Sequence, residues 1–148
     1  MYRLIAALAL CALIIGGCGD KTMPSPPTPT DLTGAWIGNL TVLGTDARMM
    51  WTLTQKDTAV SGPVLVALPS GTVLLNGFLT GTLAGSQLTY TITVGPGNIP
   101  AQPNCVGQVG GTMTATIGVP STLTGTSAVT TSTCAAPFPG GQITLTRT

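Results

Sequence analysis

The stretch Leu88-Thr-Tyr90-Thr-Ile92-Thr-Val94 alternates large apolar residues with threonine at every position. Successive side chains of a β-strand point to opposite faces, so the pattern places the apolar residues on one face and the threonines on the other. Threonine, being β-branched, is itself common in strands. The stretch therefore predicts a strand with one buried face and one solvent-exposed, threonine-rich face.

The same alternation recurs along the chain, for example in Met113-Thr-Ala115-Thr-Ile117 and Ile143-Thr-Leu145-Thr-Arg147. Turn residues such as Pro69-Ser-Gly71 separate the runs. Short connections favour an up-and-down meander, and closure into a barrel removes its exposed edges. We therefore predict an all-β fold, an eight-stranded antiparallel up-and-down barrel, with strands at 34–43, 48–55, 59–67, 72–83, 87–94, 108–117, 121–131 and 141–147.

The predicted inward positions mix large and small residues. Small residues either permit the bends of a tight barrel or leave room for a guest, because eight strands enclose just enough space for side chains or one small ligand. Sequence leaves both alternatives open. The inward set comprises Trp36, Leu40, Trp51, Tyr90 and Met113 with Gly38, Gly81, Gly111 and Gly125. The residues expected to line a ligand are Met49, Trp51, Tyr90 and Met113.

The two ends of this domain carry a further pattern. The first strand opens Leu32-Thr-Gly34-Ala35-Trp36, and the last ends Leu145-Thr-Arg147. This resembles the calycin superfamily, the lipocalins and avidins, in which a Gly-x-Trp begins the first strand and a basic residue from the barrel's end packs across the indole. The resemblance implies a lipocalin-like barrel closed by Gly34, Trp36 and Arg147. The chain lacks a second lipocalin motif and the biotin-contacting pattern of avidins, so the resemblance implies no particular ligand.

The N-terminal residues have the three regions of an export signal: Met1-Tyr2-Arg3, an uncharged apolar run over residues 4–15, and two glycines. The run is shorter than the roughly 20 residues of a transmembrane helix. Ile15-Gly16-Gly17-Cys18 resembles the bacterial lipobox. That resemblance implies a signal peptide over 1–17 and a lipidated Cys18. An ordinary secretory signal with an incidental cysteine is the alternative interpretation.

Three regions follow from this interpretation: the signal peptide 1–17, a lipidated and Pro/Thr-rich linker over 18–31, and the barrel domain 32–148. The linker's prolines favour extended polyproline II geometry, which makes it a semi-rigid tether. We expect the protein in the bacterial cell envelope, with the membrane as its partner through Cys18. In Gram-negative lipoproteins an aspartate after the lipidated cysteine often signals retention in the inner membrane, so with Gly19 at that position the lipobox resemblance implies the outer membrane.

Cys105 and Cys134 are the only cysteines after Cys18. An exported domain meets an oxidising compartment, so this pair predicts a disulfide. The predicted connections 95–107 and 132–140, each with one cysteine, fall at the same end of an up-and-down barrel. We expect the disulfide to clamp these two loops at the barrel's mouth.

The composition argues against several functions. The chain has no histidine and a net charge of +1, and all four of its acidic residues are aspartates. Nucleic-acid binding, which relies on many phosphate contacts, is not expected. Asp46 and Asp57 are interpreted as turn formers. No base is present that could activate a serine or threonine, and we expect no catalytic residues, no metal site and no cofactor.

Two functions from different classes remain. The first is a membrane-anchored envelope lipoprotein with a non-catalytic structural or interaction role and an envelope protein as its partner. The alternative is a lipocalin-like carrier that binds a small apolar ligand inside the barrel. An internal cavity would favour the carrier, whereas a filled interior would favour the structural role.

Overall fold

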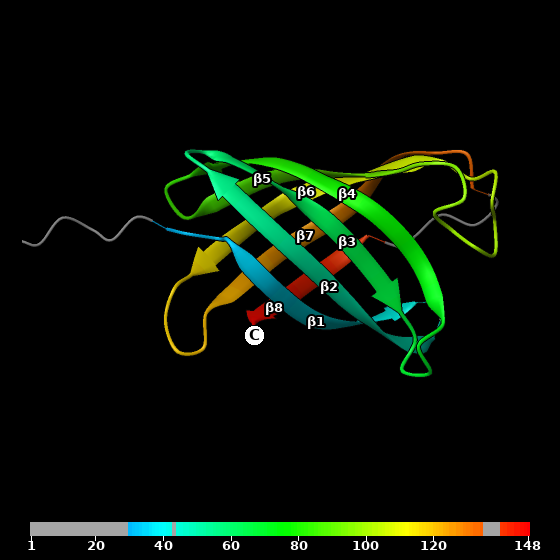
Figure 1. Cartoon of the computed structure of the whole chain (residues 1–148), viewed down its shortest axis with the longest axis horizontal. Helices are drawn as coiled ribbons and strands as arrows, with labels where there is room; N and C mark the ends of the chain where they lie inside the picture. The colour runs from blue at the N-terminus through cyan, green and yellow to red at the C-terminus, as the bar shows by residue number, and fades with distance from the viewer. Residues whose placement is uncertain (1–29, 43, 135–139) are drawn as a thin grey trace, which may run out of the picture.

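The computed structural model describes residues 30–42, 44–134 and 140–148, which form one β-barrel (Figure 1). The expected signal peptide 1–17, the expected lipidation site Cys18 and all but the last two residues of the linker lie outside the described residues. Among the described residues, none forms a helix long and apolar enough to cross a membrane.

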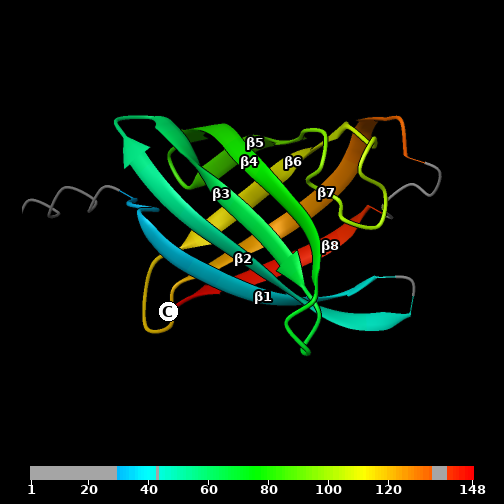
Figure 2. The ribbon, with the colours of Figure 1, turned by 45° about the vertical axis from the view of Figure 1, so that its right-hand side comes forward.

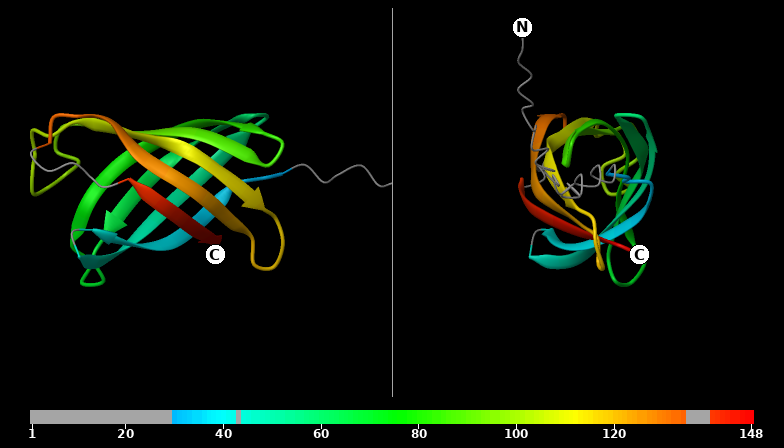
Figure 3. Two further views of the ribbon diagram at one scale, coloured as in Figure 1. Left: turned by 180° about the vertical axis from the view of Figure 1, so that it is seen from behind. Right: turned by 90° about the vertical axis from the view of Figure 1, so that its left-hand side faces the viewer.

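Eight antiparallel strands form a closed barrel in which each strand pairs with the next one in the chain and β8 pairs with β1. This confirms the predicted fold class. The views in Figures 2 and 3 show the strands winding obliquely around the barrel, with β1 between β2 and β8. The strands are β1 (Gly34–Val42), β2 (Thr45–Lys56), β3 (Ala59–Ala67), β4 (Val73–Ala84), β5 (Gln87–Val94), β6 (Gly107–Thr116), β7 (Thr122–Ser132) and β8 (Gly141–Arg147).

Both ends of β2, β4, β6 and β7 differ from the prediction, all but the start of β2 by a single residue. Two of these differences change how the barrel is interpreted. β2 begins at Thr45 rather than residue 48, because its pairing with β1 continues to the register pair Val42 and Thr45. β6 ends at Thr116, so Ile117, predicted to be the last inward residue of that strand, instead lies in the following loop with 49% of its surface exposed.

The barrel has two distinct ends. At the first, which we call the closed end, the chain enters at Thr30 and leaves after Arg147, and the connections after β2, β4 and β6 turn there (Figure 1). At the second, the mouth, lie the connections after β1, β3, β5 and β7. The two register shifts of the sheet, at Val66/Ala67 and Gln108/Val109, both lie towards the mouth. Such bulges are common at barrel rims.

The half of the barrel nearer the closed end is filled by side chains. Trp51 and Tyr90 reach across it and meet edge to face, with 5.1 Å between ring centroids. This geometry is favoured by the quadrupoles of the two rings. The side chains that are essentially inaccessible to solvent here include Trp36, Trp51, Leu53, Leu79, Leu88, Met113, Leu123 and Leu145.

Inward glycines make this dense packing possible. Gly81 and Gly111 are the register neighbours of Tyr90 on either side. A Cβ at Gly81 would lie 2.6 Å from the carbonyl oxygen of Thr89, and one at Gly125 would lie 2.7 Å from the Cα of Met113. The sequence left two roles open for the inward glycines, tight packing of the barrel or room for a ligand. These glycines allow close approach of the backbone and leave no room for a ligand.

Candidate ligand-binding cavity

Two rows of apolar side chains line the interior of the mouth half. Met49, Val66 and Leu75 are register neighbours across β2, β3 and β4. Ile92, Val109 and Val129 are register neighbours across β5, β6 and β7. They line a partly open cavity of about 240 Å³. Its complete lining is Leu40, Thr41, Met49, Val66, Leu75, Ile92, Val109, Ser127, Val129, Gly140, Gly141, Gln142 and Ile143.

Beneath this cavity, the phenol of Tyr90 contacts β7. The Tyr90 hydroxyl donates a hydrogen bond to the carbonyl oxygen of Thr126 at 3.2 Å. Burial raises the pKa of Tyr90 to about 12, and a hydrogen bond with the Ser127 side chain opposes this rise. Ser127 itself lines the cavity, so one polar residue of the lining lies beside a buried phenol.

The four residues expected to line a ligand divide between two regions. Met49 lines the cavity. Trp51, Tyr90 and Met113 do not, because they lie deeper in the barrel, where they are at most 3% exposed. They fill the space beneath the cavity. A ligand contact at these three positions therefore stays a prediction, and the cavity lining includes only Met49 of the four.

The sequence interpretation missed most of the lining, including Val66, Ile92 and Val109. These residues follow the same alternation but lie nearer the mouth end of their strands: Ile92 lies two residues beyond Tyr90 and Met49 two residues before Trp51. Weighting inward positions by their distance from the mouth, rather than by side-chain size, would have found them.

The two tryptophans differ in how their ring nitrogens are satisfied. The Trp36 Nε1 donates to the carbonyl oxygen of Leu32 at 2.9 Å. The Trp51 Nε1 is fully buried and has no hydrogen-bond partner within the described part of the chain. A buried donor without an acceptor lowers the stability of the folded protein. Burying the Trp51 ring therefore stabilises the barrel less than it would if its ring nitrogen had a partner.

The connection between β5 and β6 packs against the rim of the cavity. Ile99 of this loop is 5% exposed and joins the core cluster. The Asn76 amide on β4 donates to the carbonyl oxygen of Asn98 at 2.7 Å. Cys105 and Cys134 lie at disulfide distance, with 4.8 Å between their Cα atoms. The structure thus brings the two predicted partners together beside the mouth.

The residues expected to close the barrel meet at the opposite end. Trp36 and Arg147 are register partners, and the Arg147 guanidinium carbon lies 4.8 Å from the centroid of the Trp36 ring. The guanidinium also donates to the carbonyl oxygen of Asp31. Gly34 has φ of +134°, and a Cβ there would lie 3.8 Å from the Arg147 Nε. Hydrogen bonds from the Thr33 backbone and side chain lower the pKa of Asp31, and Arg147 adds to that effect.

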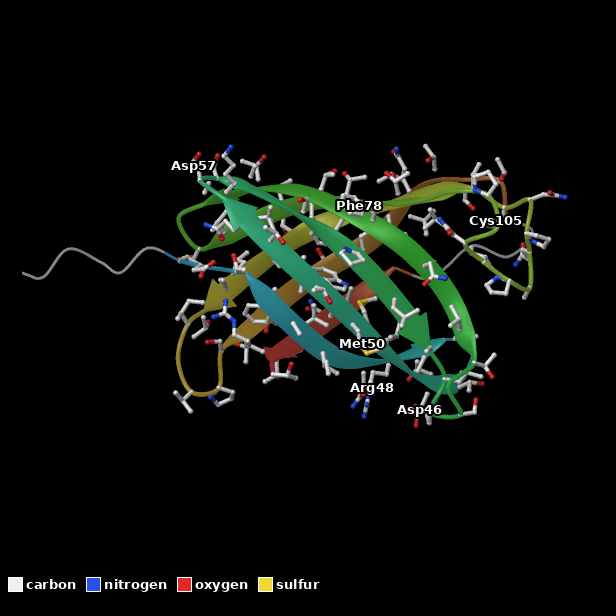
Figure 4. All side chains as sticks on the ribbon, in the orientation of Figure 1. Asp46, Arg48, Met50, Asp57, Phe78 and Cys105 are labelled. Carbon is white, nitrogen blue, oxygen red and sulfur yellow. A yellow bond between two sulfur atoms is a disulfide. The ribbon has the colours of Figure 1, made fainter. Side chains whose placement is uncertain are left out.

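Of the two expected turn formers, Asp57 lies in a turn, whereas Asp46 lies in β2 and pairs with Thr41, so the interpretation of Asp46 as a turn former is wrong. Asp57 has φ of +55° in the turn between β2 and β3, a conformation that aspartate tolerates better than most residues. Asp46, Arg48 and Met50 border an open hollow of about 590 Å³ on the outer surface near the mouth (Figure 4). In the described ranges, no three Asp, Glu, His or Cys side chains gather into a group that could hold a metal ion.

Comparison of the chain with protein-family models and with curated proteins gives no match. The closed eight-stranded antiparallel barrel is compatible with a calycin-like fold. The fold, the mouth cavity and the contacts at the closed end are therefore the basis for a functional proposal.

Proposed function

We propose that this protein is a lipid-anchored, non-catalytic envelope protein whose calycin-like barrel binds a small apolar ligand at its mouth. The observation that carries the proposal is the cavity of about 240 Å³. Its lining is mostly apolar, with Ser127 and Gln142 among its polar members, a combination typical of small-molecule sites. An apolar cavity of about 150 Å³ holds benzene, so this one suits a ligand of roughly ten non-hydrogen atoms.

The position of the cavity agrees with an anchor at Cys18. The described chain begins at Thr30, at the closed end, and the cavity lies in the mouth half. A tether from the membrane therefore attaches to the end opposite the cavity, which leaves the mouth accessible. The lipobox-like Ile15-Gly16-Gly17-Cys18 and the glycine at position 19 support an acylated protein of the outer membrane. One-chain anchors are weak, whereas several acyl chains hold a protein firmly.

A structural or interaction role is the second candidate function. It is favoured by the filled closed half and by the outer hollow beside Asp46, Arg48 and Met50, which a protein partner could occupy. The two functions differ in what happens inside the barrel. A carrier changes its interior environment when ligand is added, whereas a purely structural protein does not.

The test uses the lipidated protein in phospholipid nanodiscs, with indole as the probe ligand. We expect the methyl resonances of Ile92 and Ile143, which line the cavity, to shift on titration, and those of Leu88 and Leu145 to stay unchanged. Val109→Phe should weaken indole binding at least tenfold by filling the cavity. Thr112→Phe, an outward change of similar size on the same strand, is the matched control. Equal weakening by both variants, or no shift in the mouth half, would contradict a carrier function.

A further inference from the structure

The connection between β6 and β7, residues 117–121, exposes apolar side chains in an unusual way. Val119 is fully exposed and Ile117 is 49% exposed. Among the described residues the only other large apolar side chain of comparable exposure is Phe78, on the side of the barrel (Figure 4). Scattered single apolar residues need no explanation, but two at the tip of one loop define a small apolar prominence.

The base of this loop is held in place by the barrel. The Ser121 hydroxyl donates to the carbonyl oxygen of Gly118 at 3.0 Å and accepts from the Gly118 amide at 3.1 Å. The carbonyl oxygen of Ser121 accepts from the Arg147 amide at 3.0 Å, and Ser121 is buried. One bond thus joins the Ser121 end of the loop to β8, and the other two close the turn from Gly118 to Ser121, in which Val119 is fully exposed.

The loop projects from the closed end, the end at which Thr30 enters the barrel (Figures 1 and 3). Eleven residues, 19–29, separate Thr30 from Cys18. Fully extended, they span roughly 40 Å, so an anchor at Cys18 would keep this loop close to the bilayer. Short tethers give effective concentrations in the millimolar range. A contact too weak to recruit a free protein is therefore sufficient for a tethered one.

We propose that the tip formed by Ile117 and Val119 inserts into the interfacial layer of the bilayer that holds the Cys18 anchor. The inference rests on the proposed lipid anchor and adds an orientation to it: the closed end lies on the membrane and the mouth faces away. The charged side chains near this end are Lys56 and Arg147 against Asp31 and Asp57. They balance, so the contact is apolar and requires no anionic lipid.

The experiment places an environment-sensitive NBD label on single cysteines in the full lipidated chain, reconstituted in phosphatidylcholine vesicles. Val119→Cys reports on the loop tip, and Ser70→Cys, in the exposed turn after β3, is the matched control at the mouth. Acylated Cys18 and paired Cys105 and Cys134 would not take up the label. At position 119 we expect a blue shift, a several-fold rise in emission, and quenching by nitroxide lipids. At position 70 we expect emission as in water.

Vesicle flotation separates the inference from the anchor on which it rests. Protein that floats while position 119 emits like position 70 overturns the inference and leaves the anchor intact. Protein that does not float overturns both. A blue shift at position 119 seen only in native envelope membranes, and absent in pure phosphatidylcholine vesicles, would assign the tip to a protein partner and overturn insertion into lipid. Unchanged thermal unfolding of both variants would show that the substitutions do not disturb the fold.

Discussion

The closed half and the mouth half of the barrel are built from the same eight strands with the same alternation, yet one is filled and the other holds a cavity. The difference lies in side-chain size. Trp36, Trp51 and Tyr90 all point into the closed half, with inward glycines beside Tyr90. Valine, isoleucine, leucine and methionine line most of the mouth half. The distribution of large side chains along the strands, rather than the number of strands, thus decides where an eight-stranded barrel has room.

The two halves also differ in the contacts that join distant parts of the chain. At the closed end, Arg147 lies over Trp36 and ties the last strand to the first. At the mouth, the cysteine pair joins the loop after β5 to the end of β7. The first contact belongs to the core of the fold, whereas the second shapes the rim of the cavity. Substitutions in the two halves should therefore have different consequences.

The largest effect is expected at the closed end. Trp36→Ala should lower the free energy of unfolding by about 3–5 kcal/mol, because it removes a large buried aromatic and leaves a cavity. Urea denaturation followed by circular dichroism measures this loss. Lys56→Ala, at the exposed last residue of β2, should cost well under ~1 kcal/mol. Similar losses for both variants would mean that Trp36 is not part of a packed interior.

The cysteine pair should have the next largest effect on stability. Replacing both Cys105 and Cys134 with serine should lower the free energy of unfolding by roughly 3 kcal/mol, since the disulfide would close a long loop in the unfolded chain. Intact-mass analysis without reductant should find no alkylatable thiol at either position of the wild-type protein. Free reaction of both thiols with iodoacetamide would show that the bond is absent.

Enlarging an inward side chain should have a different cost in stability in each half of the barrel. Leu123→Phe, in the filled closed half, should cost about 1–3 kcal/mol because it overpacks a dense interior. Val109→Phe, beside the cavity, should change stability by less than ~1 kcal/mol, since the ring has space to occupy. Thermal unfolding of the two variants gives the comparison. An equal cost at both positions would argue that the mouth half is as densely packed as the closed half.

The smallest effect concerns the phenol between the two halves. Tyr90→Phe should cost about 1 kcal/mol through loss of its hydrogen bond. The pKa of Tyr90 is about 12 in the folded protein against 10.0 in a model compound. The stabilisation from the neutral phenol is therefore fully present below pH 10 and is lost as the pH rises from 10 towards 12. Between pH 10 and 12, the free energy of unfolding measured by denaturation should fall more steeply with pH for the wild type than for Tyr90→Phe.

The sequence predicted the barrel well and the cavity poorly. In an alternating stretch such as Leu88 to Val94, the polarity of each residue indicates the face of the strand on which its side chain lies. Alternation therefore shows which side chains point inward and where strands run. A cavity depends on the volumes of side chains from many strands at one level of the barrel. That level is set by strand stagger, which alternation does not show. Trp51 and Met113 are buried and lie outside the cavity lining, and alternation alone could not place them at that level of the barrel.

The exposed tip of the β6–β7 loop was also beyond the reach of the sequence. The alternation through Met113 and Ala115 continued to Ile117 and predicted it to face inward. In the structure β6 ends one residue earlier, and the bonds between Ser121 and Gly118 shape a loop instead. Where a strand ends depends on whether its neighbour continues beside it, and that is a tertiary property.

Diffraction from crystals under xenon pressure tests the central difference between the two halves most directly. Xenon occupies apolar cavities and is excluded from filled interiors. We predict a xenon site in the mouth half, among Val66, Ile92 and Val109, and none among Trp51, Leu88 and Met113. An empty mouth half under pressure, or xenon in the closed half, would contradict the assignment of the mouth as the ligand site.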